Sequence, residues 1–352
     1  MGWLRRFMSA QYFKRLMSNL NIFNGHGMFV WVASDVFGGV PSLYASEAKR
    51  LGLTNVGFKI ANGTADYNSD SLLFAIIPVL KAAGVAVWGW HYVYGYSPVA
   101  EANKAIERVN KFGLDAYVIN AEAEYKEPGK ATAAASFMTQ LRAGLPDLPI
   151  GLSSYRYPDL HMQLPWREFL SKCDFNTPQV YWMLQHNPGW QLTESLRQFR
   201  VLEPKLGLAP LPYIPTGAAF KEAGWQPTAA DLDEFDSKAK ELELPGVLWY
   251  RWGHAVMLGF DDVIAKHIWE TEDTQMEERI AALELLVAGL QTANAAQDKR
   301  LDHHGKLITE HHKKWAALEA ALPADLAARL EALEAVHAAE QALLLLRMGA
   351  GE

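Results

Sequence analysis

Short apolar runs alternate with segments of helical periodicity from residue 26 to residue 270. Eight of these runs have the length of β-strands: 28–34, 55–61, 85–93, 116–122, 149–154, 176–183, 208–214 and 246–252. Helical spacing predicts helices at 42–51, 71–83, 100–112, 132–143, 193–202 and 228–241, whereas the connection before 176–183 lacks a well-formed helical pattern. Strands and helices in this alternation predict an α/β fold, a (β/α)8 TIM-type barrel over 26–270.

The segment 1–25 precedes the predicted barrel. Its apolar side chains, from Trp3 to Leu20, recur at helical spacing with basic residues between them. It has no uninterrupted apolar core of the kind that marks a signal peptide. We expect an amphipathic helix that docks on its own domain or on a partner protein, and a membrane surface is the alternative partner.

A heptad pattern begins after the barrel. Its a and d positions are Ile280, Leu283, Val287, Leu290, Asn294, Gln297, Leu301, His304, Ile308, His311, Trp315, Leu318 and Leu322. This register predicts a coiled-coil stalk over 271–323. Pro323 interrupts it, and a C-terminal helix over 324–352 either folds back on the stalk or extends it.

Composition and charge exclude several classes of function. The formal net charge of −7 argues against general nucleic-acid binding. A single cysteine, Cys173, excludes an intramolecular disulfide framework and a cysteine-type zinc site. We expect no cofactor and no metal. No apolar run reaches the roughly 18 residues of a transmembrane span.

The stretch 116–125 is the strongest candidate for chemistry. It begins apolar and ends with Glu122 and Glu124. Alternate side chains of a strand share one face, so Asn120, Glu122 and Glu124 would point together at the C-terminal end of a barrel strand, where barrel enzymes build active sites. The alternative is that the strand ends near Asn120 and that 122–127 form a solvated loop.

Polar and aromatic side chains at the other predicted strand ends complete the candidate site. Aromatic faces at such positions commonly bind sugar rings, although core packing would explain most of them. The candidate substrate-binding residues are Lys59, Trp90, Tyr92, Asn120, Tyr155, Gln179, Tyr181, Trp249 and Arg251.

Several of these strand ends resemble the family-25 lysozymes, the muramidase barrels common in phages. The stretch 57–63 (GFKIANG) resembles their Lys-Ala-x-x-Gly motif, 90–92 (WHY) their Tyr-His-Phe, and 249–252 (WYRW) their Trp-Gln-Tyr end. At 120–122 (NAE) the family has Asp-x-Glu. The resemblance implies a glycoside-hydrolase barrel in which Glu122 is the general acid.

The chain departs from the family at two carboxylates. Asn120 replaces the acid of the fourth strand, and the first strand, 28–34, has no acidic residue where the family carries an Asp. A glycosidase normally needs two carboxyl groups. Glu124 or Asp35 is therefore the expected partner of Glu122, unless the N-acetyl group of the substrate acts as the nucleophile.

Two functional hypotheses follow. The first is a glycosidase that acts on a bacterial surface glycan of the cell wall or capsule. The second is a barrel without catalysis that serves as a glycan-binding or structural module. A barrel joined to a stalk suits a phage tail protein, so we expect a virion location, or an extracellular one after lysis, with 1–25 or the C-terminal helices contacting other tail or baseplate proteins.

We predict that the chain is a parallel homotrimer held together through 280–322. Trp315 at an a position is bulky for a dimer seam, whereas Asn294 at an a position favours a dimer. Light scattering should give a trimeric mass for the full chain and a monomeric mass for a chain that ends at Glu270. A monomeric full chain, or a trimer that persists without the stalk, would contradict the prediction.

Overall fold

The computed structural model describes residues 20–267, 269, 283–288, 311–314, 316–317 and 326–349. The chain divides into two compact units, Met1–Trp269 and Glu270–Glu352, which are described separately. The predicted N-terminal helix and most of the predicted heptad seam lie outside the described residues. Among those that are described, no helix is long and apolar enough to cross a membrane.

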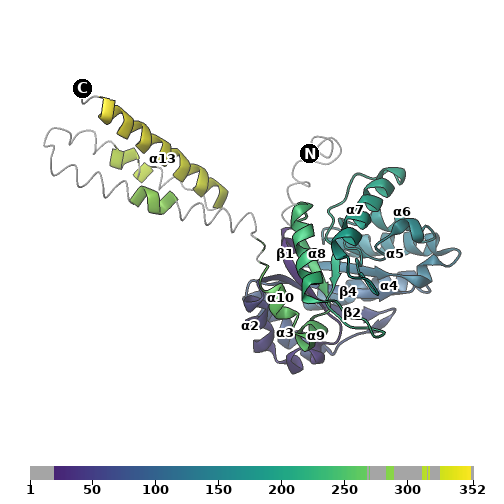
Figure 1. Ribbon diagram of the computed structural model, residues 1–352. Helices are drawn as coiled ribbons and strands as arrows, with labels where there is room; N and C mark the ends of the chain where they lie inside the picture. Colours follow the sequence, from purple (N-terminus) through teal and green to yellow (C-terminus); the bar gives the residue numbers. More distant parts are fainter. Residues whose placement is uncertain are drawn as a thin grey trace. The chain divides into compact units, whose positions relative to one another are not determined.

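The first unit is an α/β fold in which eight parallel strands curl into a (β/α)8-like half-barrel (Figure 1). The strands are β1 (Gly25–Val30), β2 (Leu53–Asn62), β4 (Ala86–Val93), β5 (Ala116–Ala121), β6 (Ile150–Ser153), β7 (Phe175–Asn176), β8 (Thr216–Ala218) and β9 (Gly246–Tyr250). They are ordered β7-β6-β5-β4-β2-β1-β9-β8, and the short β3 (Ala65–Asp66) pairs antiparallel with β2. β7 and β8, the two ends of this order, are not joined by a ladder of strand pairing. Among the described residues only the isolated bridges Asn176–Tyr213 and Gln179–Thr216 connect the two segments.

Helices surround the strands in Figure 1. They are α2 (Pro41–Arg50), α3 (Asp70–Ala82), α4 (Pro98–Phe112), α5 (Lys130–Gly144), α6 (Trp166–Leu170), α7 (Pro188–Lys205), α8 (Ala229–Glu241), α9 (Trp252–Leu258) and α10 (Asp261–Ile264). Local sequence fixes several of their ends. Ser69 caps α3, Thr228 and Asp231 form a capping box at α8, and Gly113 ends α4 in the left-handed conformation.

The sequence placed most of these elements correctly, and it failed at two strands. The predicted strand 208–214 lies before β8, which begins at Thr216, and only Tyr213 of that stretch makes a bridge. The predicted strand 176–183 is reduced to β7, with a further bridge at Gln179. Prolines explain the short ladders, because Pro178, Pro212 and Pro215 have no N–H to donate to a neighbouring strand.

Alternate side chains of the strands divide the core of the first unit in two. One set faces the helices and forms the larger cluster, which includes Met28, Phe58 and Tyr117. The other set faces the barrel interior and includes Phe29, Trp88, Trp90, Val118 and Leu248. Phe23, from the 3-10 turn before β1, packs on Trp88 and Phe175 with ring centroids 5.9 and 4.5 Å away.

The second unit contains α13 (Leu326–Gly349) and shorter helical pieces. Val287, Leu333 and Val336 are buried in it. Nε2 of His311 lies 3.9 Å from Oε1 of the buried Glu340 in the middle of α13. This contact brings α13 beside residue 311, so the C-terminal helix folds back instead of extending the chain. The coiled-coil seam itself lies largely outside the described residues.

Gly57 leaves room for the largest side chain of the barrel interior. A Cβ at this position would lie 2.2 Å from the ring of Trp88, which is fully buried and donates from Nε1 to Oδ1 of Asn55 at 2.8 Å. We predict that Gly57→Ala lowers the free energy of unfolding by about 2 kcal/mol or more, the usual cost of overpacking a tight core. Urea denaturation of the purified chain measures this change.

Gly253→Ala is the matched control. It lies in α9, where the nearest atom to an added Cβ is Asp35 O at 3.5 Å, an ordinary contact. This control should leave stability unchanged or slightly raised, because alanine favours helix over glycine. Equal stability of the Gly57→Ala variant and the native chain would show that the barrel interior is not packed as described.

Candidate active site

A cavity of about 570 Å³ opens at the C-terminal ends of the strands. Its lining is Trp31, Lys59, Trp90, Tyr92, Asn120, Glu122, Gln179, Tyr181, Met183, Phe220, Lys221, Glu222, Tyr250, Arg251 and His254. Most of these side chains lie on the inward-facing side of their strands, beyond the packed residues of the barrel interior. The cavity is therefore the part of the interior that opens at the C-terminal ends of the strands. Aromatic walls with a few polar groups between them are typical of small-molecule sites.

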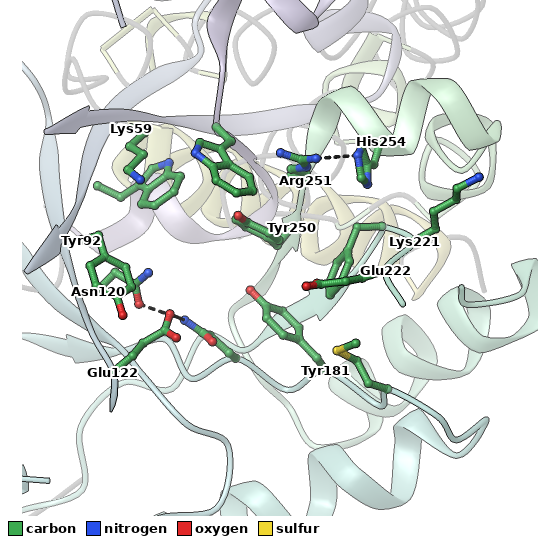
Figure 2. A pocket seen from close by; sticks show the side chains of 15 residues that line it. Lys59, Tyr92, Asn120, Glu122, Tyr181, Lys221, Glu222, Tyr250, Arg251 and His254 are labelled. Atoms are coloured by element: carbon green, nitrogen blue, oxygen red, sulfur yellow. Dashed lines mark hydrogen bonds between the residues drawn. The ribbon is translucent and has the colours of Figure 1, made fainter. Parts of the chain in front are cut away.

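Glu122 lies immediately after β5, where the backbone turns into a 3-10 helix over Ala123–Lys126. Its Oε1 accepts a hydrogen bond of 2.9 Å from Nε2 of Gln179 (Figure 2). The same amide nitrogen donates to Oδ1 of Asn120, also at 2.9 Å. Gln179 therefore fixes the orientation of Glu122 and Asn120 together.

Lys59 reaches the cavity from β2 and is only 6% exposed. Its Nζ lies 4.3 Å from the ring centroid of Tyr67, 5.2 Å from that of Trp90 and 5.5 Å from that of Trp31. Burial lowers the pKa of Lys59 to about 8, and the nearby carboxylate of Glu122 partly opposes this shift. Keeping the ammonium group of Lys59 charged in this buried position therefore costs free energy, and the group lies near the candidate acid Glu122.

Tyr181, Tyr250 and Phe220 form an aromatic wall between Glu122 and Glu222, as Figure 2 shows for the labelled residues. The ring centroids of Tyr181 and Tyr250 are 5.8 Å apart, and Phe220 lies 5.1 and 5.7 Å from them. Burial raises the pKa of both tyrosines, and both carboxylates add to the shift. Both hydroxyls therefore stay protonated at neutral pH.

Arg251 and His254 form the opposite end of the cavity (Figure 2). The guanidinium of Arg251 lies 4.5 Å from the ring centroid of Trp31, and its Nη2 donates to Nε2 of His254 at 2.5 Å. Burial and the neighbouring cations Arg251 and Lys221 lower the pKa of His254, so the imidazole is neutral and accepts this bond.

Most of the residues predicted from sequence meet in this cavity: Lys59, Trp90, Tyr92, Asn120, Glu122, Gln179, Tyr181 and Arg251. Asp35 is exposed and lines a neighbouring cavity of about 420 Å³ that shares Trp31, Arg251 and His254 with the first. It does not line the cavity that contains Glu122.

Besides Asp35, three further predicted residues do not line the cavity. Glu124 lies in the 3-10 turn after β5, where strand alternation no longer applies, and accepts a hydrogen bond of 2.7 Å from the hydroxyl of Tyr92. Trp249 faces the helices and packs on Phe235, with ring centroids 5.4 Å apart.

Tyr155 is the third, and it stacks on His161 with ring centroids 3.6 Å apart. Its bridge to Gln179 joins the backbones only. Its side chain therefore contributes to the loop after β6 and not to the cavity wall.

Sequence reasoning missed seven lining residues: Trp31, Met183, Phe220, Lys221, Glu222, Tyr250 and His254. Alternation would have found two of them, because Trp31 follows the inward-facing Phe29 and Tyr250 follows the inward-facing Leu248. Glu222 comes from the loop after β8, and no periodic signal marks it.

No protein-family model and no curated protein matches the chain. Solved structures with a similar fold include chitinases. They include a family-18 chitinase from Cycas revoluta in complex with allosamidin (TM-score 0.53, 10% identity, 68% of this chain and 98% of that chain covered). A family-18 chitinase from Flavobacterium johnsoniae (0.51, 9%, 69% and 93%) and a class V chitinase from Nicotiana tobaccum (0.51, 7%, 69% and 98%) are also similar.

At this level of identity the similarity establishes the fold alone, a distant TIM-barrel fold. It is not a similarity to family-25 lysozymes or to phage proteins in particular.

We predict that Lys59 titrates near pH 8. Nuclear magnetic resonance of the chain with ε-¹³C-labelled lysine should show one signal with this midpoint, and that signal should be missing in Lys59→Met. Because the pKa is lower in the folded state, the unfolded chain binds the extra proton between about pH 8 and 10.5. Lys59 therefore destabilises the fold most below pH 8, and this penalty fades as the pH rises. A midpoint at the ordinary value of about 10.5 would contradict the burial of the ammonium group.

Proposed function

We propose that the cavity binds a glycan and that Glu122 acts as the general acid in cleavage of a glycosidic bond. One observation carries this proposal: Glu122 lies at the C-terminal end of β5, inside the cavity, with one oxygen held by Gln179. In this role Glu122 protonates the glycosidic oxygen as the bond from that oxygen to the anomeric carbon breaks.

The walls of the cavity support a sugar ligand. Six aromatic side chains line it: Trp31, Trp90, Tyr92, Tyr181, Phe220 and Tyr250. Aromatic faces pack on the C–H faces of sugar rings, and the amides and charged groups between them suit hydroxyl groups.

The second catalytic group has two candidate sources. Asn120, beside Glu122, is neutral and cannot act as a nucleophile or stabilise a cation by charge. Glu222 is the other carboxylate among the described residues that line the same cavity. Alternatively, the acetamido group of the substrate itself attacks the anomeric carbon in place of a protein nucleophile, and a second carboxylate is then needed only to orient that group. A family-18 chitinase of similar fold has been solved with an N-acetylglucosamine trimer, so N-acetylglucosamine oligomers are the first substrates to test.

A second candidate function is glycan binding without cleavage, and Asn120 is the observation that favours it. The neutral amide stands beside Glu122, where the family-25 pattern has an acid. A role on a phage tail or similar particle, a cell-wall or capsule substrate, and a homotrimeric assembly are further parts of the proposal, and they rest on the sequence patterns alone.

We predict that Glu122→Gln reduces cleavage of N-acetylglucosamine oligomers or of peptidoglycan by about 10²–10⁴-fold, the usual contribution of general acid catalysis. The variant keeps the acceptor for Gln179, so its melting temperature and its glycan affinity should stay close to those of the native chain. Reducing-end release and calorimetric titration measure the two quantities.

Glu127→Gln is the matched control, because Glu127 is exposed and accepts a hydrogen bond from Tyr96 outside the cavity. It should leave cleavage unchanged. Full activity of Glu122→Gln would remove Glu122 from the mechanism. A native chain that binds these glycans without cleaving them would favour the second candidate function.

A further inference from the structure

Two cations of the cavity, the buried Lys59 and the partly buried Arg251, have no carboxylate partner among the described residues. No carboxylate of the residues that the structure describes lies within 4.0 Å of Lys59 or of Arg251, whereas the buried Arg108 and the partly buried Arg142 are both paired. Removing a cation from water without a partner is costly. Two such groups in one cavity suggest that the missing partner belongs to the ligand.

Lys59 is the more buried of the two. The ring centroids of Tyr67, Trp90 and Trp31 lie within 5.5 Å of its Nζ, which makes no hydrogen bond within the described part of the chain. The carboxylate of Glu122 acts electrostatically on Lys59, but one of its oxygens already accepts a hydrogen bond from Gln179. Lys59 thus keeps its donors directed at the cavity.

Arg251 lies at the junction of the two cavities and lines both. Its Nη2 donates to His254, and the other guanidinium N–H groups make no hydrogen bond to the described residues. The flat guanidinium packs over Trp31, whose ring also lies 5.5 Å from Nζ of Lys59. Both cations therefore approach the same ring.

The carboxylates near these two cations do not neutralise them. Glu122 and Glu222 line the main cavity, and Asp35 lines the side cavity. None of the three forms an ion pair with Lys59 or Arg251, and the exposed Lys221 adds a further positive charge at the rim. The neutral His254 accepts from Arg251 and does not compete with it for an anion.

We propose that the cavity selects an acidic glycan and binds a sugar carboxylate beside Trp31, between Arg251 and Lys59. The proposal rests on the proposed glycan-binding function and names the substrate class for the same site. A guanidinium presents parallel N–H groups that match the two oxygens of a carboxylate, and Lys59 adds a point charge. Uronic acids are the simplest sugars with this group.

Matched oligosaccharides test the proposal. Hyaluronan and galacturonan hexasaccharides carry uronic acids, and carboxyl reduction converts each into a neutral oligosaccharide with the same linkages. Calorimetric titration of the full chain should show at least one acidic oligosaccharide binding about tenfold or more tightly than its reduced form, with a preference that shrinks at high salt.

Arg251→Met and Lys59→Met should each remove most of this preference. Lys126→Met is the control: it also deletes one positive charge, but Lys126 packs over Tyr155 outside the cavity and should keep the preference. The acidic oligosaccharide should also raise the pKa of Lys59 from its value of about 8, which a purely structural lysine would not show.

Each outcome bears on one proposal. Equal binding of acidic and reduced oligosaccharides, or binding of neither in both series, overturns the acidic-glycan proposal. Cleavage of neutral oligomers by the native chain and not by Glu122→Gln would support the proposed function, whether or not the acidic-glycan proposal is overturned. Tight acidic binding that depends on Arg251, without any cleavage, would support the carboxylate site and contradict the catalytic role of Glu122.

Discussion

The alternation of side chains along strands that share one interior decides which residues of this unit are packed and which line the cavity. Each strand sends every second side chain inward, and the interior fills from Phe23 at one end through Trp88 to the cavity. The glycine at position 57 makes room for Trp88. Residues that follow the packed layers on the same faces, such as Lys59 and Glu122, therefore line the cavity.

The sequence predicted those parts of the fold that follow a simple period. Strands β2, β4 and β5 and most helices were found because their patterns are long and regular. The β7 and β8 region was misplaced because prolines shorten the ladder and leave bridges too brief for a periodic signal. The predictions for Glu124 and Trp249 were wrong for a related reason. For Glu124, the alternation of side chains was continued beyond the end of β5 at Ala121. For Trp249, the alternation was started on the wrong face of β9.

The electrostatics of the cavity depend on which charges find partners inside the protein. Gln179 holds Glu122 and Asn120, so the amide keeps one carboxylate in place without neutralising it. Lys59 and Arg251 have aromatic and imidazole neighbours instead of carboxylates. The side chains that set these charges come from β2, from the end of β5, from the segment after β7 and from the end of β9. No single sequence motif contains them all, so the charge pattern of the cavity could not be predicted from the sequence.

The proposed function requires a glycan to bind in the cavity with its glycosidic oxygen at Glu122. A crystal structure of the Glu122→Gln chain with a bound oligosaccharide would show whether it does. We expect a sugar ring packed on the aromatic walls, with the glycosidic oxygen within hydrogen-bond distance of the side chain at position 122. A sugar bound away from this cavity, or one whose glycosidic bonds all lie far from position 122, would contradict it.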